Sequence, residues 1–287
     1  MSNNTRGQGV DSAHKFEWPS SPVIYLTVDY ECDYGTALTE NSYGALEETP
    51  WLASLIEELE IPLTCFVQTR VFDERPEQVE QLRSASSPVT FHPHSHSHRP
   101  RDETDIGNEI SKATAAYEDF FGRSPVGYRF PNGNVRSTDY ELLAENGYKF
   151  DASVFPSWRP GHFDNTNAPT RPQFFTDYDL LEIPFTVYSD RIRIPTALSY
   201  CRLLGRPFTE LLARRPPPVV IFNIHMHDLV NPPAFNELSP LYRGIYSRNP
   251  DGKSLLTRVL KRLQRRGYEF RQLDDLHESF RKYEAKS

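Results

Sequence analysis

The stretch PVIYLTVDYECD, residues 22–33, joins a run of strand-forming side chains to a cluster of acids. Its first part is rich in β-branched and aromatic side chains, which indicates a buried β-strand over residues 22–29. Asp29, Glu31 and Asp33 follow at alternate positions. Residues i and i+2 at a strand end point to the same side, so Asp29 and Glu31 are predicted to share one site there.

Segments with strand and helix patterns alternate along the rest of the chain. Further strands are expected over residues 62–68, 88–91, 126–130, 148–152, 180–187, 219–224 and 268–271. Helices are expected over residues 45–60, 76–84, 104–121, 196–214 and 254–266, with others near residue 137 and at the C-terminus. This alternation favours a single parallel α/β domain, either barrel-like or doubly wound. We expect it to cover residues 21–287, after a disordered leader at residues 1–20.

Composition and charge exclude several classes of protein. The chain has 287 residues, 38% of them hydrophobic, which is enough for a core, and a net charge of −7, which argues against a nucleic-acid partner. Its three cysteines are widely spaced and do not form a disulfide framework. Residues 1–17 are polar, and the longest apolar run, near residues 219–224, is too short to span a membrane. We therefore expect a cytoplasmic protein with no membrane span.

The histidines are unevenly distributed, because six of the nine lie in two short segments: His92, His94, His96 and His98 in one, and His225 and His227 in the other. A helical turn would let His94 and His98 face one metal ion, whereas an extended backbone would place all four clustered histidines on one face. The spacing alone does not choose between these, and histidines that bind nothing are the alternative. Two imidazoles and one carboxylate suit zinc, cobalt, nickel or ferrous iron.

In both candidate architectures, functional residues follow the carboxyl ends of the strands. By this rule five strand ends contribute to one site: the acids after residue 28, the histidine cluster, Arg129, Asp151 and His225. A hydrolytic metal site uses three protein ligands and leaves one position for water, and that water needs a base nearby. One of Asp29 and Glu31 can serve as the ligand and the other as the base.

Several short motifs occur in the order found in the polysaccharide deacetylases, carbohydrate esterase family four, and the chain resembles chitooligosaccharide deacetylases of that family over residues 22–280. The family motif TFDDG is matched by TVDYE at residues 27–31, and the later motifs by HSHSH at 94–98, RFPNG at 129–133, FDAS at 150–153 and IH at 224–225. Each motif alone is weak, but the ordered set is a strong signal.

The resemblance implies a distorted (β/α) TIM-like barrel of about seven parallel strands in a single catalytic domain. It also implies that Asp29 is the catalytic base and that His94 and His98 bind one divalent metal, with zinc expected and cobalt, nickel or iron as alternatives. The second aspartate of the first motif is replaced by Tyr30. By the D-x-E variant of the motif, Glu31 becomes the third ligand, with Asp33 as the fallback.

The resemblance implies roles for the remaining site residues as well. Arg129 pairs with the base carboxylate, His225 protonates the leaving amine, and Asp151 orients His225. The backbone N–H near Asn132 resembles the donor that stabilises the oxyanion. Substrate-binding positions are expected at Tyr30, Asn132 and His227.

The function implied by the resemblance is metal-dependent hydrolysis of a carbon–nitrogen bond, removing an N-acetyl group from an amino sugar. The partner is then an amino-sugar glycan or a sugar-linked precursor. Hydrolysis of a non-sugar amide or formyl group on the same scaffold is one alternative. A ferrous-iron oxygenase uses a similar triad, but the α/β alternation does not match its all-β barrel. A catalytically inactive glycan-binding protein is a further alternative, supported by the altered first motif.

Overall fold

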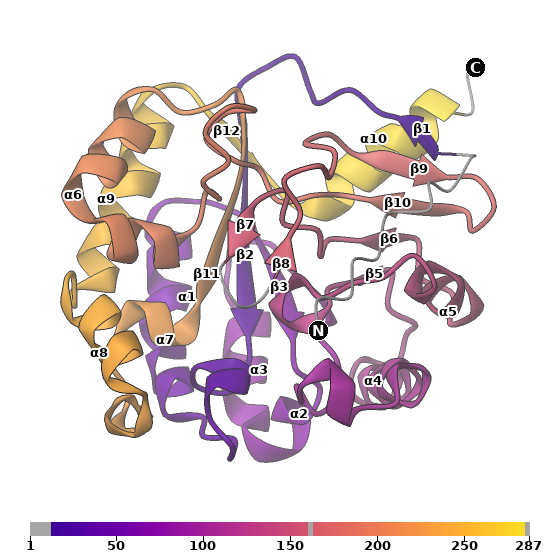
Figure 1. The fold of residues 1–287 in the computed structure, drawn as a ribbon, viewed down its shortest axis with the longest axis horizontal. Coiled ribbons are helices and arrows are strands. Elements are labelled where there is room, and N and C mark those ends of the chain that lie inside the picture. Colours follow the sequence, from indigo (N-terminus) through magenta and orange to yellow (C-terminus); the bar gives the residue numbers. More distant parts are fainter. Residues whose placement is uncertain (1–12, 160–162, 285–287) are drawn as a thin grey trace.

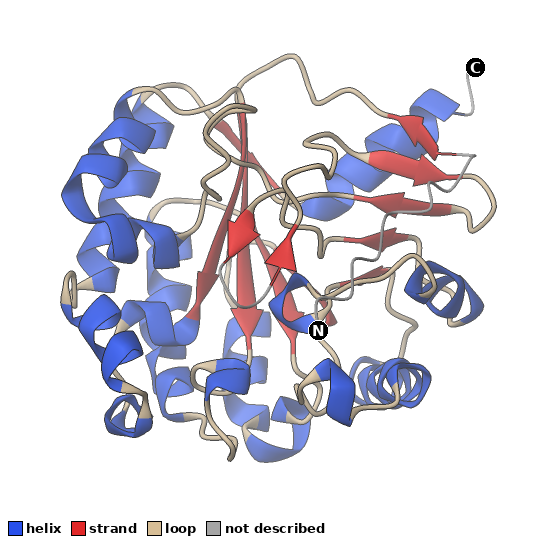
Figure 2. Ribbon diagram, in the orientation of Figure 1, coloured by secondary structure: helices blue, strands red, loops and turns tan. Residues whose placement is uncertain are grey.

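A computed structural model describes residues 13–159 and 163–284, with strands running through the interior and helices along their outer side (Figures 1 and 2). The central strand is β2 (Val23–Tyr30), which pairs along its length with β11 (Val219–His225). On its other side β2 pairs first with β12 (Glu269–Arg271) and then with β3 (Leu63–Val67), which pairs with β4 (Val89–Pro93). All of these pairs are parallel.

A second sheet continues the curl of the first. It runs β1 (Ala13–Lys15), β9 (Gln173–Phe175), β10 (Leu180–Glu182), β6 (Phe150–Asp151) and β5 (Gly127–Tyr128). β5, β6 and β10 are parallel to one another, whereas β9 is antiparallel to β1 and β10. The Arg129 N–H donates to the Pro93 carbonyl at 3.2 Å, which joins β5 to β4. The expected distorted α/β barrel is therefore confirmed.

Helices cover the outer side of this barrel (Figure 2). They are α1 (Thr49–Glu58), α2 (Val71–Glu74), α3 (Pro76–Arg83), α4 (Ile106–Phe121), α5 (Asp139–Glu145), α6 (Leu198–Arg214), α7 (Met226–Leu229), α8 (Pro240–Ser247), α9 (Gly252–Arg265) and α10 (Leu273–Glu284). β7 (Trp158–Arg159) and β8 (Phe163–Asp164) form a short antiparallel pair. In residues 13–159 and 163–284, no helix has both the length and the apolarity needed to cross a bilayer.

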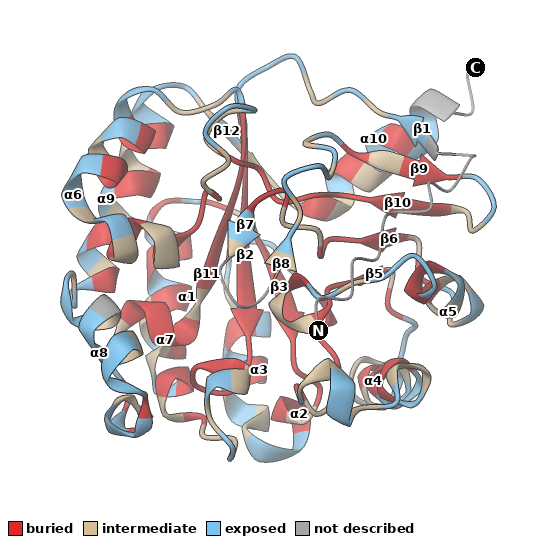
Figure 3. Ribbon diagram, in the orientation of Figure 1, coloured by how far each residue is buried: buried red, intermediate tan, exposed pale blue. Residues whose placement is uncertain are grey.

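The two faces of β2 bury their side chains in different places. Ile24, Leu26, Val28 and Tyr30 belong to the core between the sheet and the covering helices, whereas Val23 and Tyr25 pack inside the barrel. Every residue of β2 is buried, as expected of a strand covered on both sides (Figure 3). The alternation continues toward the carboxyl end of β2. Thr27 and Asp29 therefore also point to the interior side of the barrel, beyond this inner core.

The N-terminal boundary differs from the expected one. Residues 1–12 lie outside the described residues, but β1, within the segment expected to be disordered, pairs with β9. Phe16 and Trp18 pack against the inner core, and the Trp18 indole donates to the Thr170 carbonyl at 2.9 Å. The ordered domain therefore begins before residue 21, because a sheet edge far along the chain was available to pair with β1.

Several elements differ in length from their expected ranges. The strand expected over residues 180–187 is short, because only Leu180–Glu182 pairs within a sheet. The helix expected over residues 196–214 is interrupted at Gly205, whose φ is +72° and which precedes Pro207. Proline has no N–H to donate, and only glycine adopts this φ readily, so the chain turns there.

Candidate active site

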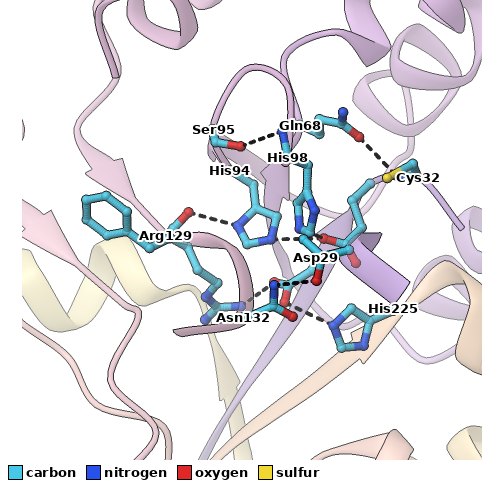
Figure 4. Close-up of polar contacts among 12 residues, drawn as sticks. Asp29, Cys32, Gln68, His94, Ser95, His98, Arg129, Asn132 and His225 are labelled. Carbon is cyan, nitrogen blue, oxygen red and sulfur yellow. Dashed lines mark hydrogen bonds and ion pairs between the residues drawn. The ribbon is translucent and has the colours of Figure 1, made fainter. Parts of the chain in front are cut away.

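The carboxyl ends of the parallel strands bring together side chains that are far apart in sequence (Figure 4). Asp29 near the end of β2 lies in register with His225 at the end of β11. On the other side of β2, Asp29 is in register with Phe66, which is in turn in register with His92 of β4. The site therefore forms along one edge of the barrel, as the strand-end rule predicts.

Glu31, His94 and His98 form one buried cluster whose ligand atoms all lie within 4.8 Å of one another. The Glu31 Oε2 atom is 3.0 Å from His94 Nε2 and 2.5 Å from His98 Nε2. His94 Nδ1 lies 2.8 Å from the Arg129 carbonyl, to which it can only donate. In a neutral His94 the Nε2 lone pair therefore faces the carboxylate, and a cation between them is needed to make this contact favourable.

The buried Nδ1 of His98 has no hydrogen-bond partner in the described part of the chain, and its Nε2 faces only the Glu31 carboxylate, at 2.5 Å. Buried polar atoms are rarely left without partners, so the ring lacks something that the protein alone does not supply. A carboxylate and two imidazoles are a donor set for zinc and for other divalent transition metals. Glu31, His94 and His98 therefore fit a metal ion.

Asp33 lies in a different environment from Glu31. Its Oδ2 accepts from the Ser42 hydroxyl at 2.9 Å and the Gly44 N–H at 2.8 Å, and its Oδ1 accepts from the Ala45 N–H at 2.9 Å. Asp33 thus holds the start of the short 3₁₀ helix at Gly44–Glu48. The structure places Glu31, rather than the fallback Asp33, against both histidines.

The segment that carries the two histidines is neither a helical turn nor an extended strand. Ser95 and His98 have positive φ values of 61° and 55°, which turn the chain so that both rings face Glu31. One carboxylate oxygen of Glu109 in α4 accepts from the N–H groups of His96, at 3.1 Å, and Ser97, at 2.8 Å. A side chain from a neighbouring helix therefore fixes a turn that the histidine spacing did not reveal.

Gln68 connects the two chain segments that carry the clustered residues. Its Oε1 accepts from the Cys32 N–H at 3.0 Å, next to Glu31 (Figure 4). Its Nε2 donates to the Ser97 carbonyl at 3.1 Å, next to His98. Gln68 is fully buried, so both bonds are shielded from water. The amide therefore sets the distance between the acid and the second histidine.

Asp29 forms a buried ion pair with Arg129, whose Nη1 lies 2.6 Å from Asp29 Oδ1. The other Asp29 oxygen accepts from Asn223 Nδ2 at 3.0 Å. Burial raises the pKa of Asp29, but the Arg129 charge and the nearby histidines outweigh this, so the pKa lies well below its ordinary value. Asp29 is therefore ionised at neutral pH and can accept a proton.

His225 lies between two carboxylates. Its Nε2 is 3.4 Å from Asp29 Oδ2, and its Nδ1 is 3.0 Å from Asp228 Oδ2, which also accepts the His225 N–H at 3.0 Å. Burial lowers the pKa of His225, but the hydrogen bonds to Asp228 and Asp29 outweigh it and hold the pKa well above its ordinary value. The ring is therefore an imidazolium that can donate a proton.

The expectation that Asp151 orients His225 is corrected by these contacts. Asp151 Oδ1 accepts from the Ser153 hydroxyl at 2.6 Å, and the residue pairs in register with Glu182 of β10. The carboxylate that orients His225 is Asp228, which sequence reasoning left without this role. The H-M-H-D spacing contained the signal, because residues i and i+3 at the start of α7 form a capping box.

Two further residues hold the Asp228 backbone in place. Arg202 of α6 is fully buried, and its Nη1 donates to the carbonyls of His227 and Asp228 at 3.2 and 3.0 Å. Gly252, the first residue of α9, packs so closely against this turn that a Cβ atom there would lie 1.8 Å from the backbone carbonyl oxygen of Asp228. The helices α6 and α9 therefore enclose the turn that carries Asp228.

Tyr30 is not a substrate-binding residue, which corrects a second expectation. Its hydroxyl lies 2.5 Å from Thr49 Oγ1, and its side chain is fully buried in the core under the helices. Adjacent residues of a strand point to opposite faces, so Tyr30 points away from the side shared by Asp29 and Glu31. The substitution in the first motif thus adds to the core rather than to the site.

The other two expected substrate-binding residues border the cluster. Asn132 has a φ of 56° and donates from Nδ2 to Thr36 Oγ1 at 3.0 Å. His227 stacks on His225 with ring centroids 4.9 Å apart, and its Nδ1 accepts from the Tyr34 N–H at 3.1 Å. Burial and the neighbouring His225 lower the pKa of His227 to about 4, so at neutral pH its ring is neutral with the hydrogen on Nε2.

The remaining histidines of the first cluster have structural contacts. His92 Nε2 lies 3.1 Å from Asp274 Oδ2, and its Nδ1 accepts from the Gly127 N–H at 3.1 Å. His96 Nδ1 lies 3.0 Å from the Thr69 hydroxyl. His92 and His96 therefore tie strands and loops together and do not join the cluster with Glu31.

Residues 18–150 match the family described as polysaccharide deacetylase, which confirms the predicted resemblance. A peptidoglycan deacetylase from Helicobacter pylori is 27% identical over 109 residues, which are 37% of this chain and 36% of that protein. The match thus spans about a third of the relative's length.

Solved structures share the fold at low sequence identity. A Mycobacterium smegmatis protein assigned to the polysaccharide deacetylases has a TM-score of 0.60 at 19% identity, covering 94% of each chain. A pseudoenzyme of carbohydrate esterase family four from Bacillus anthracis has a TM-score of 0.53 at 13% identity, covering 91% of this chain and 66% of that one. A mutant of that pseudoenzyme, described as having restored enzymatic activity, has a TM-score of 0.53 at 15% identity, covering 91% and 69%. These similarities establish the distorted barrel.

The buried carboxyls of Asp151 and Glu182 predict a pH dependence of stability. Burial raises the pKa of Asp151 from 3.8 to about 6, and burial together with Asp151 raises the pKa of Glu182 well above its ordinary value. As pH rises from about 4 to about 6, the unfolded chain loses these protons before the native state does, so the free energy of unfolding falls. We expect Asp151→Asn to lessen this fall by on the order of 3 kcal/mol, measured by urea unfolding at several pH values.

The control for this experiment is Asp102→Asn, which changes an exposed carboxyl. Its unfolding free energy should follow that of the unmodified chain at every pH. Parallel curves for the unmodified chain and Asp151→Asn would show that the buried carboxyl does not retain its proton.

Proposed function

We propose that this chain, which resembles the polysaccharide deacetylases, is a metal-dependent hydrolase that removes the N-acetyl group of an amino sugar. The observation that carries the proposal is the position of Glu31, whose Oε2 contacts the Nε2 atoms of both His94 and His98. The first motif of the family is altered in this chain, yet a carboxylate still completes the set of three candidate ligands. The proton-transferring pair, Asp29 and His225, lies beside this set.

Glu31, His94 and His98 would hold the metal, with zinc as the expected ion and cobalt, nickel or iron as alternatives. A bound divalent ion supplies Lewis-acid polarisation of the amide carbonyl and lowers the pKa of water. The protein contributes by keeping His94 in one tautomer, since His94 Nδ1 donates to the Arg129 carbonyl. Gln68 and Glu109 fix the loops that carry the three residues.

Asp29 and His225 divide the proton transfers between them. Asp29 is held ionised by Arg129 and oriented by Asn223, so it can take a proton from water as a general base. His225 is held as an imidazolium by Asp228 and Asp29, so it can give a proton to the leaving amine as a general acid. Amide hydrolysis needs both steps, because the amine is a poor leaving group until it is protonated.

An amino-sugar glycan or a sugar-linked precursor is the proposed substrate, on the basis of the family resemblance. His227 lies beside His225 and presents a neutral Nε2–H, which suits a sugar hydroxyl or a carbonyl oxygen. An inactive glycan-binding protein is the competing function, since a pseudoenzyme has the same fold. The contact of Glu31 with both histidines favours the active enzyme.

Replacing Glu31 should abolish tight metal binding. We expect Glu31→Ala to lower zinc affinity by more than about a hundredfold, because loss of a direct ligand exceeds the loss of an outer-shell partner. Asp33→Asn is the control, since the Asp33 carboxylate accepts from the N–H groups of Gly44 and Ala45 instead of contacting the two histidines. Its zinc affinity, measured by competition with a chelator, should stay unchanged. The opposite result, with Asp33→Asn losing the metal, would make Asp33 the ligand.

Replacing Asp29 should separate metal binding from catalysis. We expect Asp29→Asn to lower the rate of acetate release from N-acetylglucosamine oligomers by about 10²- to 10⁴-fold, because the general base is lost. Its metal content, measured by elemental analysis, should remain that of the unmodified chain. Acetate release at the unmodified rate by Asp29→Asn would assign the base to another group.

The amide of Gln68 should control metal affinity from outside the ligand set. We expect Gln68→Met, which removes both bonds between the two loops, to weaken zinc binding by about tenfold. Gln264→Met is the matched control, because Gln264 also donates to a backbone carbonyl, that of Leu59, away from the site. If both variants bind zinc equally well in chelator competition, Gln68 has only a general stabilising role.

A further inference from the structure

A cationic groove lies between α6 and α9, which pack beside each other on one side of the barrel (Figure 1). Arg258, Lys261, Arg262 and Arg265 of α9 stand at positions i, i+3, i+4 and i+7 and therefore share one helix face. The opposite face of α9 is buried in the core. Across the groove, α6 contributes Arg206 and Glu210, and the six side chains line a hollow of about 500 Å³.

The cations of this groove are only partly neutralised by the protein. Glu210 pairs with Arg262 at 2.6 Å and with Arg214 at 3.3 Å, and Lys261 pairs with Glu58 at 2.8 Å. In residues 13–159 and 163–284, no carboxylate oxygen lies within 4.0 Å of the guanidinium groups of Arg206, Arg258 or Arg265. These three arginines are exposed.

This local excess of cations is opposite in sign to the net charge of the chain, which is −7. Like charges at helical spacings of three and four residues repel one another, so the stripe on α9 carries a cost in stability. A bound anion removes that repulsion. The guanidinium group also matches phosphate oxygens with two parallel hydrogen bonds, and four of the five cations in the groove are arginines.

The position of the groove separates it from the candidate active site. The C-terminal half of α9 leads into β12, whose first residue pairs with the first residue of β2. The groove therefore lies toward the amino ends of the parallel strands, whereas Asp29 and His225 lie at their carboxyl ends. A ligand there is not the amide that is hydrolysed.

We propose that this groove is a binding site for a phosphate-bearing ligand that carries several phosphate groups in a row. The stripe from Arg258 to Arg265 is about 10 Å long, from the rise of an α-helix, which suits more than one phosphate. All six lining residues are charged, so the groove presents charged groups to a ligand and no apolar residue to a lipid chain. The ligand is therefore a free oligophosphate group rather than a membrane.

The proposal is tested by titrating tripolyphosphate into the full chain in a calorimeter at low and moderate salt. We expect saturable binding that weakens as salt rises, because the groove is open to solvent. A variant with Arg206→Gln, Arg258→Gln and Arg265→Gln should bind about tenfold or more weakly. A control with Arg83→Gln, Arg123→Gln and Lys282→Gln loses the same charge at exposed sites elsewhere and should bind like the unmodified chain.

A variant that binds tripolyphosphate more tightly gives a further test, because unfolding of a variant can only weaken binding. Glu210→Gln removes the single carboxylate among the lining residues, so it should bind tripolyphosphate more tightly than the unmodified chain. Absence of saturable binding, or equal binding by the groove variant and the charge-matched control, overturns the proposal. Binding to phosphatidylglycerol vesicles without binding to tripolyphosphate also overturns it, in favour of a membrane surface.

Discussion

The buried guanidinium of Arg129 is the interaction on which the candidate site depends. Its Nη1 donates to Asp29 at 2.6 Å and to Asn223 at 2.9 Å, and its Nε donates to the Ala152 carbonyl at 2.8 Å. Its own carbonyl accepts from His94. One residue thus connects strands β2, β11 and β6 with the loop after β4. Because a buried charge must stay paired, these elements keep their relative positions. The side chain of Arg129 holds the base, and its backbone carbonyl holds the first candidate ligand.

The altered first motif makes sense once strand geometry is considered. In the usual motif the two aspartates are adjacent, whereas here the second carboxylate comes one residue later. In a regular strand that shift returns the side chain to the face of Asp29, and Glu31 adds one methylene group of reach. Tyr30, now between them, turns into the core and bonds Thr49. The change therefore preserves a carboxylate beside both histidines instead of removing it.

The sequence predicts a residue's position correctly where that position follows from the regular period of a strand or helix. It does not predict the position where contacts with an element far along the chain determine it. The pairing of Asp29 with Glu31 follows from the period of a strand. The turn that joins His94 and His98 depends on Glu109 in another helix, and no local pattern reveals it. Asp151 was misassigned because its role was taken from the family motif, while the i, i+3 spacing of His225 and Asp228, a local signal that the fold bears out, was not used.

The close approach of Gly252 to Asp228 divides α6 and α9 into two faces with different tolerance of substitution. A side chain larger than that of glycine does not fit at the first residue of α9. Arg202 of α6 donates hydrogen bonds to the carbonyls of the same turn. The inward faces of these two helices are therefore intolerant of substitution. Their outward faces carry exposed charges that pack against nothing in the core. Substitutions on the outward surface of this helix pair, including the cationic groove, therefore change surface charge without moving the acid–base pair on the inner side.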